Sequence, residues 1–187
     1  MRQRIGISHV AAVVSIVFAG AIFGFFYAWV CSTMWGLDAA DPRVAIEAMQ
    51  QMNASVRNGV FFPAFFLTPV VLGVTALLSY RAGHRRPSAW FLGAAVVYLA
   101  GGLILTATVN VPMNNDLADV VIPASLAEAE FVWRDYSDRW QVWNTIRTIA
   151  SGAALILAAI GLGTLFAGSG GMGGRGASAR IAPPVQG

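Results

Sequence analysis

Polar and aromatic residues just before the last apolar segment are candidates for a small-molecule site. Trp140, Asn144, Arg147 and Ser151 recur at the spacing i, i+4, i+7 and i+11, which places them on one helix face, with Trp143 beside it. Small-molecule sites in helical bundles commonly lie between helices and combine apolar side chains with a few polar groups. The alternative is that Arg147 extends to the membrane surface while the tryptophans form an interfacial belt.

A second polar group follows the preceding apolar segment. That segment ends near Asn110, and the last one begins near Arg147, so both residues are expected at similar depth on the same side of a membrane. Asn114 lies one helical turn beyond Asn110. A cation at the membrane rim is stabilised by any partner that reduces its desolvation cost. We therefore predict a cluster in which Arg147 contacts Asn110, Asn114 or a carboxylate of a neighbouring loop.

Four long segments without charge must position these groups. Each exceeds the roughly 20 residues of a membrane-spanning helix, and they cover residues 5–37, 58–80, 87–115 and 148–174. We predict an all-α, integral membrane four-helix bundle within residues 1–167. Its spans are expected at about 10–34, 59–80, 89–108 and 148–167. Residues 168–187 are Gly-rich and are predicted to form a flexible cytoplasmic tail.

The distribution of arginine predicts the orientation. The second loop carries Arg81, Arg85 and Arg86, and the termini carry the other clear excess of arginine, at Arg2, Arg4, Arg175 and Arg180. Acidic residues dominate the third loop. The positive-inside rule then makes both termini cytoplasmic and directs the first and third loops outward. We expect a multi-pass protein of the plasma (inner) membrane.

The two outward loops contain signals for short helices. Asp41 followed by Pro42 marks a helix start, and the residues behind it predict an amphipathic helix at the outer rim. Its expected apolar face comprises Val44, Ala45, Ala48, Met49, Met52 and Val56. In the third loop, Ser125 and Glu128 form a capping box. The helix that starts there either ends before Ser137, which then caps the last span, or continues into that span.

Composition excludes several classes of protein. The chain is 57% apolar and only 11% charged, with a mean hydropathy of +0.64, whereas about a quarter of the residues in soluble domains are charged. The twelve basic residues are all scattered arginines, so no basic stripe for nucleic acid exists. The single Cys31 excludes an internal disulfide and paired-thiol chemistry. The two histidines, His9 and His84, map to the predicted cytoplasmic side, which argues against a haem-bearing bundle.

The expected partners are the lipid bilayer and a small lipophilic molecule. Gly20 and Gly24 permit close helix contact, either within the bundle or between protomers of a homo-oligomer. No metal site is assigned. A copper(I) site is the alternative to a core-packing role for the four methionines of the outer side, Met34, Met49, Met52 and Met113.

Two motifs are more specific than these patterns: Asn110-Val-Pro112-Met-Asn114 at the end of the third span and Trp140-x-x-Trp143-Asn144-x-x-Arg147-Thr148 entering the fourth. A weaker third motif is Met49-Gln-x-Met52-Asn53, with Gly20 and Gly24 in the first span. Together they resemble the anthrone oxygenase-like family of small four-helix membrane proteins, over about residues 8–167. The resemblance implies a four-helix membrane fold and oxidation of an anthrone to an anthraquinone without metal or flavin.

The implied reaction requires specific groups. A base removes a proton from the carbon opposite the carbonyl, the resulting anion reacts with oxygen, and the peroxide loses water. Under this resemblance Arg147 and Asn144 suit the anionic oxygen and Asp116 is the first candidate for the base, with Glu47 second. The substrate-binding residues would be Asn110, Asn114, Trp140, Trp143 and Asn53. The alternative for Asp116 is a solvated carboxylate or a salt bridge to Arg147.

Two functions from different classes follow. The first is a membrane oxygenase or related oxidoreductase that acts on a lipophilic aromatic molecule at the outer rim. The second is a non-catalytic accessory or small-ligand-binding protein, in which the Asn/Trp/Arg cluster only joins the outer helix ends.

Overall fold

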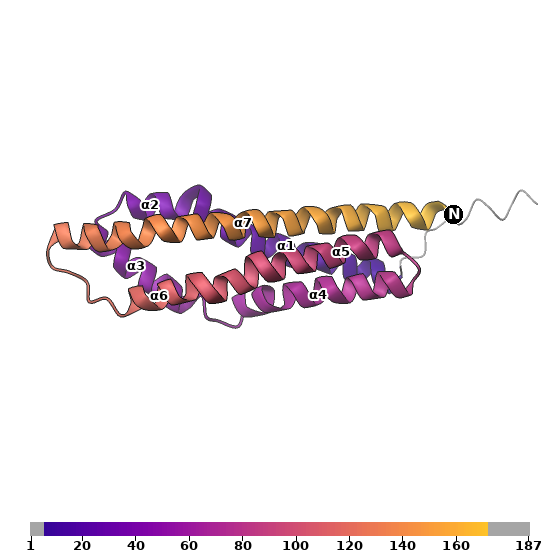
Figure 1. Cartoon of the computed structure of the whole chain (residues 1–187), viewed down its shortest axis with the longest axis horizontal. Helices are drawn as coiled ribbons and strands as arrows, with labels where there is room; N and C mark the ends of the chain where they lie inside the picture. The colour runs from indigo at the N-terminus through magenta and orange to yellow at the C-terminus, as the bar shows by residue number, and fades with distance from the viewer. Residues whose placement is uncertain (1–5, 172–187) are drawn as a thin grey trace, which may run out of the picture.

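The computed structural model describes residues 6–171, with side chains described for residues 6–167. This part of the chain consists of helices and short connections (Figure 1). Residues 168–171 continue the last helix, whereas the rest of the predicted tail and the terminal arginines lie outside the described residues.

Four helical rods are long and apolar enough to cross a membrane, which confirms the predicted all-α membrane fold. The first combines α1 (Ile7–Ala28), η1 (Trp29–Thr33) and α2 (Met34–Asp38), and the second is α4 (Phe61–Arg81). The third combines α5 (Arg85–Tyr98), η2 (Leu99–Ile104), η3 (Thr106–Asn110) and α6 (Val111–Ala118). The fourth is α7 (Leu126–Gly171). A separate helix, α3 (Pro42–Ser55), connects the first rod to the second.

Helix lengths show which part of the protein fits a bilayer. The 21 residues of α4 extend over ~32 Å, close to the ~30 Å of the hydrocarbon core. The 46 residues of α7 extend over ~69 Å, so this helix continues well beyond the membrane. Figure 1 shows α7 running the whole length, with α2, α3 and α6 gathered at one end and the α4–α5 turn at the other. We call α2, α3, α6 and residues 126–143 of α7 the head.

Both ends of the described chain lie at the end of the bundle opposite the head, next to the α4–α5 turn (Figure 1). This agrees with an even number of spans. The side of the membrane that this end faces stays a prediction.

The head and the remaining parts of the four rods, which we call the membrane half, each have their own apolar core. In the membrane half, the buried core consists mainly of aromatic, leucine and alanine side chains from all four rods: Ala12, Ile22, Phe26, Phe65, Leu72, Ala76, Phe91, Ala94, Ala95, Tyr98, Ala154, Ala158 and Leu165. In the head, the buried core comprises Met34, Ala45, Ile46, Met49, Leu117, Ala129, Trp133, Tyr136 and Trp140. The small alanine side chains allow the helices to approach one another closely, which is typical of helix packing in membranes.

The rods approach closely where α5 and η2 pass α7. A Cβ atom added at Gly101 would lie 2.5 Å from the Cβ atom of Ala150. Only glycine therefore fits at this crossing. The third rod contains two segments of π-helix, which are frequent at functional sites because they rotate the side chains that follow.

The first-loop helix begins as predicted. The Asp41 side chain accepts a hydrogen bond from the Arg43 backbone N–H at 2.9 Å, and Pro42 occupies the first turn. Hydrogen bonds from Arg43 lower the pKa of Asp41 to about 2. The predicted apolar face is confirmed at Ala45 and Met49, which are buried, and at Met52, which packs against the head core. It differs at two positions, because Val44 is exposed and Ile46, which was not predicted, is buried.

In the third loop the single-helix alternative is confirmed, because α7 is continuous from Leu126. Ser125 accepts a hydrogen bond from the Glu128 N–H at 3.5 Å, which is half of the predicted capping box. Ser137 caps no helix. Its hydroxyl donates to Asp38 Oδ1 at 2.8 Å, and the same carboxylate accepts from Trp133 and Gln141, so α2 is fastened to α7.

Candidate functional site

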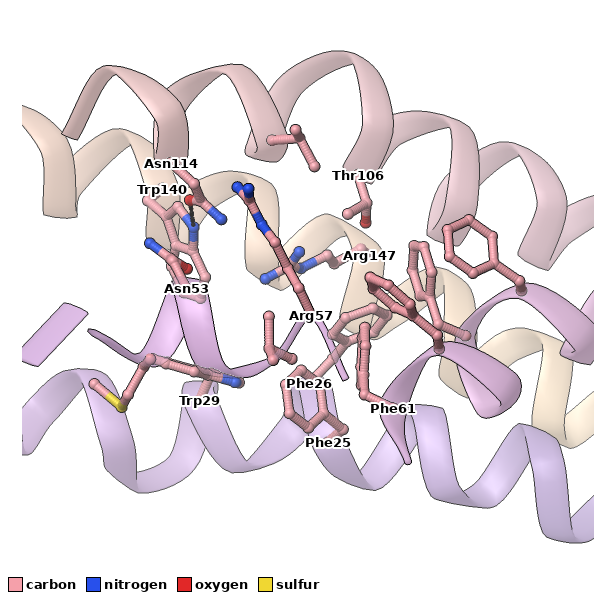
Figure 2. A pocket seen from close by; sticks show the side chains of 16 residues that line it. Phe25, Phe26, Trp29, Asn53, Arg57, Phe61, Thr106, Asn114, Trp140 and Arg147 are labelled. Atoms are coloured by element: carbon pink, nitrogen blue, oxygen red, sulfur yellow. Dashed lines mark hydrogen bonds between the residues drawn. The ribbon is translucent and has the colours of Figure 1, made fainter. Parts of the chain in front are cut away.

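A pocket opens where the head meets the membrane half, at the level where α4 begins. Its volume is about 220 Å³. Figure 2 shows the sixteen side chains that line it, which come from all four rods and from α3 and its connection to α4. They are Phe25, Phe26, Trp29, Met52, Asn53, Val56, Arg57, Phe61, Phe62, Phe65, Phe66, Thr106, Val111, Asn114, Trp140 and Arg147. No Asp, Glu, His or Cys belongs to this lining.

Aromatic rings form most of the pocket wall. The Phe25 and Phe61 rings lie 4.7 Å apart between centroids, and Phe61 stacks on Phe65 at 5.3 Å. On the side of the head, Trp29 and Trp140 meet edge to face at 5.1 Å. Because these planar surfaces border one cavity, the pocket suits a flat apolar ligand.

Arg147 provides the pocket with a buried cation. Its side chain is only 5% exposed, and its guanidinium carbon lies 4.5 Å from the centroid of Phe26 and 4.9 Å from that of Trp140. Arg147 Nε donates a hydrogen bond to Asn144 Oδ1 at 2.9 Å. Asn144 in turn donates through Nδ2 to the backbone carbonyl oxygen of Phe26 at 3.3 Å. Asn144 therefore orients the guanidinium and ties it to α1.

The two terminal nitrogens of Arg147 face the cavity (Figure 2). Within residues 6–167, no hydrogen bond or salt bridge joins them to an acceptor. The predicted contact of Arg147 with Asn110, Asn114 or a loop carboxylate is therefore wrong as far as hydrogen bonds are concerned. The oxygen it uses belongs to Asn144, one turn earlier on the same helix, and the oxygen of Asn114 is already occupied.

Asn114 is at the centre of a hydrogen-bond network on the head side of the pocket. Its Oδ1 accepts from the Tyr136 hydroxyl at 2.8 Å and from Trp140 Nε1 at 3.0 Å. Asn53 Nδ2 donates to the same Tyr136 hydroxyl at 3.4 Å. This network joins α3, α6 and α7. Tyr136 is not among the residues that the sequence predicted for the site, although it lies four residues before Trp140 and so shares that helix face.

Arg57 is a second cation that sequence analysis missed. It lies in the α3–α4 connection, where its side chain is exposed, and it lines the pocket. Its Nη2 atom donates to Asn115 Oδ1 at 2.9 Å, which directs the side chain across the pocket towards α6 (Figure 2). The sequence feature that could have identified Arg57 is its isolation, because it is the one charged residue between Glu47 and Arg81.

Several residues predicted for the site lie elsewhere. Asp116 is exposed and borders a separate groove with Tyr136 and Arg139. Two residues along a helix rotate a side chain by ~200°, so Asp116 faces away from the side that Asn114 presents. Trp143 is likewise rotated out of the pocket, and Glu47 is exposed on α3. The structure therefore brings neither candidate base to the pocket.

Asn110 is fully buried but does not line the pocket. Its side-chain nitrogen and oxygen have no hydrogen-bond partner within the described part of the chain. The four outer methionines pack in or against the head core, as expected for the core-packing alternative. Among the residues that the structure describes, no group of three or more His, Cys, Asp or Glu is arranged to hold a metal ion.

The fold and the pocket define a class: a four-helix membrane protein with an aromatic pocket that contains a buried arginine, for which the described residues supply no carboxylate partner. A profile of the family described as anthrone oxygenase matches residues 56–157, more than half of the chain, so the protein belongs to this family. The matched segment includes Arg57, Asn114, Trp140, Asn144 and Arg147. No curated protein and no solved structure matches the chain.

Proposed function

We propose that the protein is a membrane oxygenase that oxidises a flat, lipophilic, anthrone-like molecule at the outer rim of the membrane. The observation that carries this proposal is the position of Arg147. This residue lies in the segment that matches the family, and its terminal nitrogens face a pocket walled by aromatic rings. A buried cation that has no carboxylate partner among the described residues is costly, even where it bonds to a neutral amide, as Arg147 does to Asn144. An anionic intermediate that forms in this pocket would provide the missing partner.

The proposed reaction consumes one O2 and releases one water for each anthrone converted to anthraquinone. Loss of the proton from the carbon opposite the carbonyl leaves an anion whose negative charge lies largely on the carbonyl oxygen. Arg147, held by Asn144, donates to that oxygen. The anion transfers electrons to O2, a carbon–oxygen bond forms, and the hydroperoxide eliminates water to leave the second carbonyl. Oxygen is the oxidant.

The lining supports stabilisation of the anion more than proton removal by a side chain. No carboxylate or imidazole lines the pocket, and the two lining arginines act as hydrogen-bond donors to the anion rather than as bases. The proton therefore passes to water at the pocket mouth. The contribution of the protein is to make that ionisation favourable and to hold the ring flat against Phe61 and Phe65.

The location of the pocket fits a substrate dissolved in lipid. Phe62 and Phe66 of α4 and Val111 at the start of α6 line the pocket and are also partly exposed. A lipophilic ligand can thus enter from the bilayer between α4 and the third rod. In the orientation we propose, Arg81, Arg85 and Arg86 face the cytoplasm, and the pocket lies at the outer surface.

A non-catalytic ligand-binding protein is the second candidate. The hydrogen bonds among Asn53, Tyr136, Asn114 and Trp140 favour it, because they join three helices at the pocket rim as a purely structural clasp would.

Oxygen uptake distinguishes these functions. Phosphatidylcholine vesicles that contain the protein would be given an emodin-type anthrone, and O2 consumption and quinone absorbance would be followed together. Protein-free vesicles control for spontaneous oxidation in air. The oxygenase predicts a protein-dependent rate with one O2 consumed for each quinone formed, whereas a rate equal to that of protein-free vesicles would contradict it.

A further inference from the structure

We propose that Arg57 is a second anion-binding residue, and that Arg57 and Arg147 together bind the ionised oxygen of a flat aromatic acid, a phenolate or a carboxylate. This inference concerns the same pocket as the proposed oxygenase and specifies the ionisation state of its ligand. It requires binding but no turnover.

Charge balance in the pocket is the first argument. The lining holds two arginines and no acidic residue. The salt bridges of the described residues join Arg43 to Asp41, Arg134 to Glu130 and Arg139 to Asp135, so none neutralises the pocket. A site that carries two positive charges among aromatic walls attracts an anion and disfavours a cation.

Unused hydrogen-bond donors are the second argument. The Arg147 side chain is only 5% exposed. Its two terminal nitrogens nevertheless point into the cavity without an acceptor among the described residues. Arg57 uses one terminal nitrogen on the neutral amide of Asn115. Guanidinium groups that served only to hold helices together would be expected to bond to carboxylates or backbone carbonyls of neighbouring elements. The terminal nitrogens of Arg147 face the cavity and Arg57 lines it while bonded only to a neutral amide, so an ionised oxygen in the cavity would accept from both.

The pocket wall specifies the rest of the ligand. Rings from Phe25, Phe61 and Phe65 surround the cavity, and its volume of about 220 Å³ exceeds the roughly 150 Å³ that accommodates benzene in an engineered protein cavity. A bicyclic or larger aromatic ring therefore fits, with part of it extending through the lipid-facing mouth.

The ionisation of 2-naphthol tests this inference, because naphthol and naphtholate absorb at different wavelengths. Protein in phosphatidylcholine nanodiscs would be titrated with 2-naphthol across pH. We expect binding to lower the pKa of the naphthol by at least one unit, and naphtholate to bind at least tenfold more tightly than the neutral isostere 2-methoxynaphthalene. Arg57→Gln and Arg147→Gln should each reduce the preference for the anion by at least threefold, and Arg57→Lys should restore part of it.

Arg134→Gln is the matched control, because Arg134 is an exposed arginine of α7 outside the pocket. It should leave the preference unchanged. Equal affinity for naphtholate and 2-methoxynaphthalene, or an unchanged preference in folded Arg57→Gln protein, would overturn the inference. Displacement of naphtholate by phosphatidylglycerol at equal membrane concentration would identify a lipid-headgroup site and would also overturn it.

The outcome is separable from that of the proposed function. Naphthol lacks the acidic carbon of an anthrone, so the titration reports binding without oxidation. A lowered naphthol pKa combined with protein-independent O2 uptake would refute the oxygenase and leave the anion site intact. The opposite pair of results would refute the anion site alone.

Discussion

Replacing Arg147 by methionine separates a functional arginine from a structural one. The variant removes the charge but keeps a long, unbranched side chain beside Phe26 and Trp140. If Arg147 serves the ligand, the protein without ligand does not need the charge. We therefore expect Arg147→Met protein to fold with nearly unchanged stability and to lose activity.

The expected change in stability is a balance of opposing contributions. The hydrogen bond to Asn144 contributes ~0.6 kcal/mol on average and up to ~1.7 kcal/mol, judging by other membrane proteins. Each of the two cation–π contacts contributes ~0.5–2 kcal/mol, and sulfur–aromatic contacts of the new methionine return ~0.3–1.5 kcal/mol. Removal of the charge regains up to ~2.5–3.5 kcal/mol of insertion cost. At the middle of these ranges the losses and the gains nearly cancel, so the expected net change in the free energy of unfolding is about 1 kcal/mol or less.

The assay pairs unfolding with turnover. Unfolding would be followed by tryptophan fluorescence during titration with dodecyl sulfate in mixed micelles, and turnover by O2 uptake. Loss of a preorganised donor to the anion predicts a rate reduction of about 10²–10³-fold. Ile149→Met is the control, because Ile149 lies on the exposed face of α7 and should change neither quantity.

Two results would refute the reasoning. Destabilisation by 3 kcal/mol or more is expected when one partner of a buried ion pair is removed, roughly 3–5 kcal/mol, and would show that Arg147 is chiefly structural. Full activity in well-folded Arg147→Met protein would show that the arginine has no part in the chemistry.

Three further predictions concern packing, the first-loop helix and orientation. Gly101→Ala should destabilise the bundle by about 1–3 kcal/mol in dodecyl sulfate unfolding, because the new methyl group collides with α7, whereas Gly73→Ala, which meets nothing within 4 Å, should have almost no effect; equal stabilities would contradict the close crossing. Asp41→Asn protein should be less stable to heat than wild type at pH values above 3.8, the ordinary pKa of the carboxyl group. The difference should disappear as the pH falls through the lowered pKa of about 2, because the carboxylate then loses the charge that stabilises the folded state. A difference that persists below that pH would contradict the role assigned to Asp41. His84→Cys protein in a Cys31→Ser background should resist an impermeant maleimide added outside intact cells and should react after lysis. Reaction in intact cells would show that the α4–α5 turn faces outward and would contradict the proposed orientation.

The membrane fold was predictable because charge in hydrocarbon is so costly that the gaps between charges reveal the spans. The rods nevertheless extend beyond the predicted spans, to Asp38, Ala118 and Leu126. Their extensions pack against one another in the head, so they need no lipid and carry charges. Hydropathy reports the part of a helix that lies in lipid, whereas tertiary packing determines where the helix ends.

The candidate site was predictable where its residues share one helix. Trp140, Asn144 and Arg147 are brought together by the periodicity of α7, and the same periodicity extends back to Tyr136. Arg57 comes from another element, and no sequence period connects it to α7. Asp116 is close to Asn114 in sequence but lies outside the pocket, because a helix directs neighbouring residues to different faces.

The central claim is that Arg147 serves the oxidation of an anthrone in this pocket. Its most direct test is the O2 uptake of wild-type and Arg147→Met protein, reconstituted at equal amount in the same phosphatidylcholine vesicles with the same anthrone. We predict one O2 per quinone at a protein-dependent rate for the wild type, and the rate of protein-free vesicles for the variant although it is folded. Equal rates for the two proteins would contradict the claim.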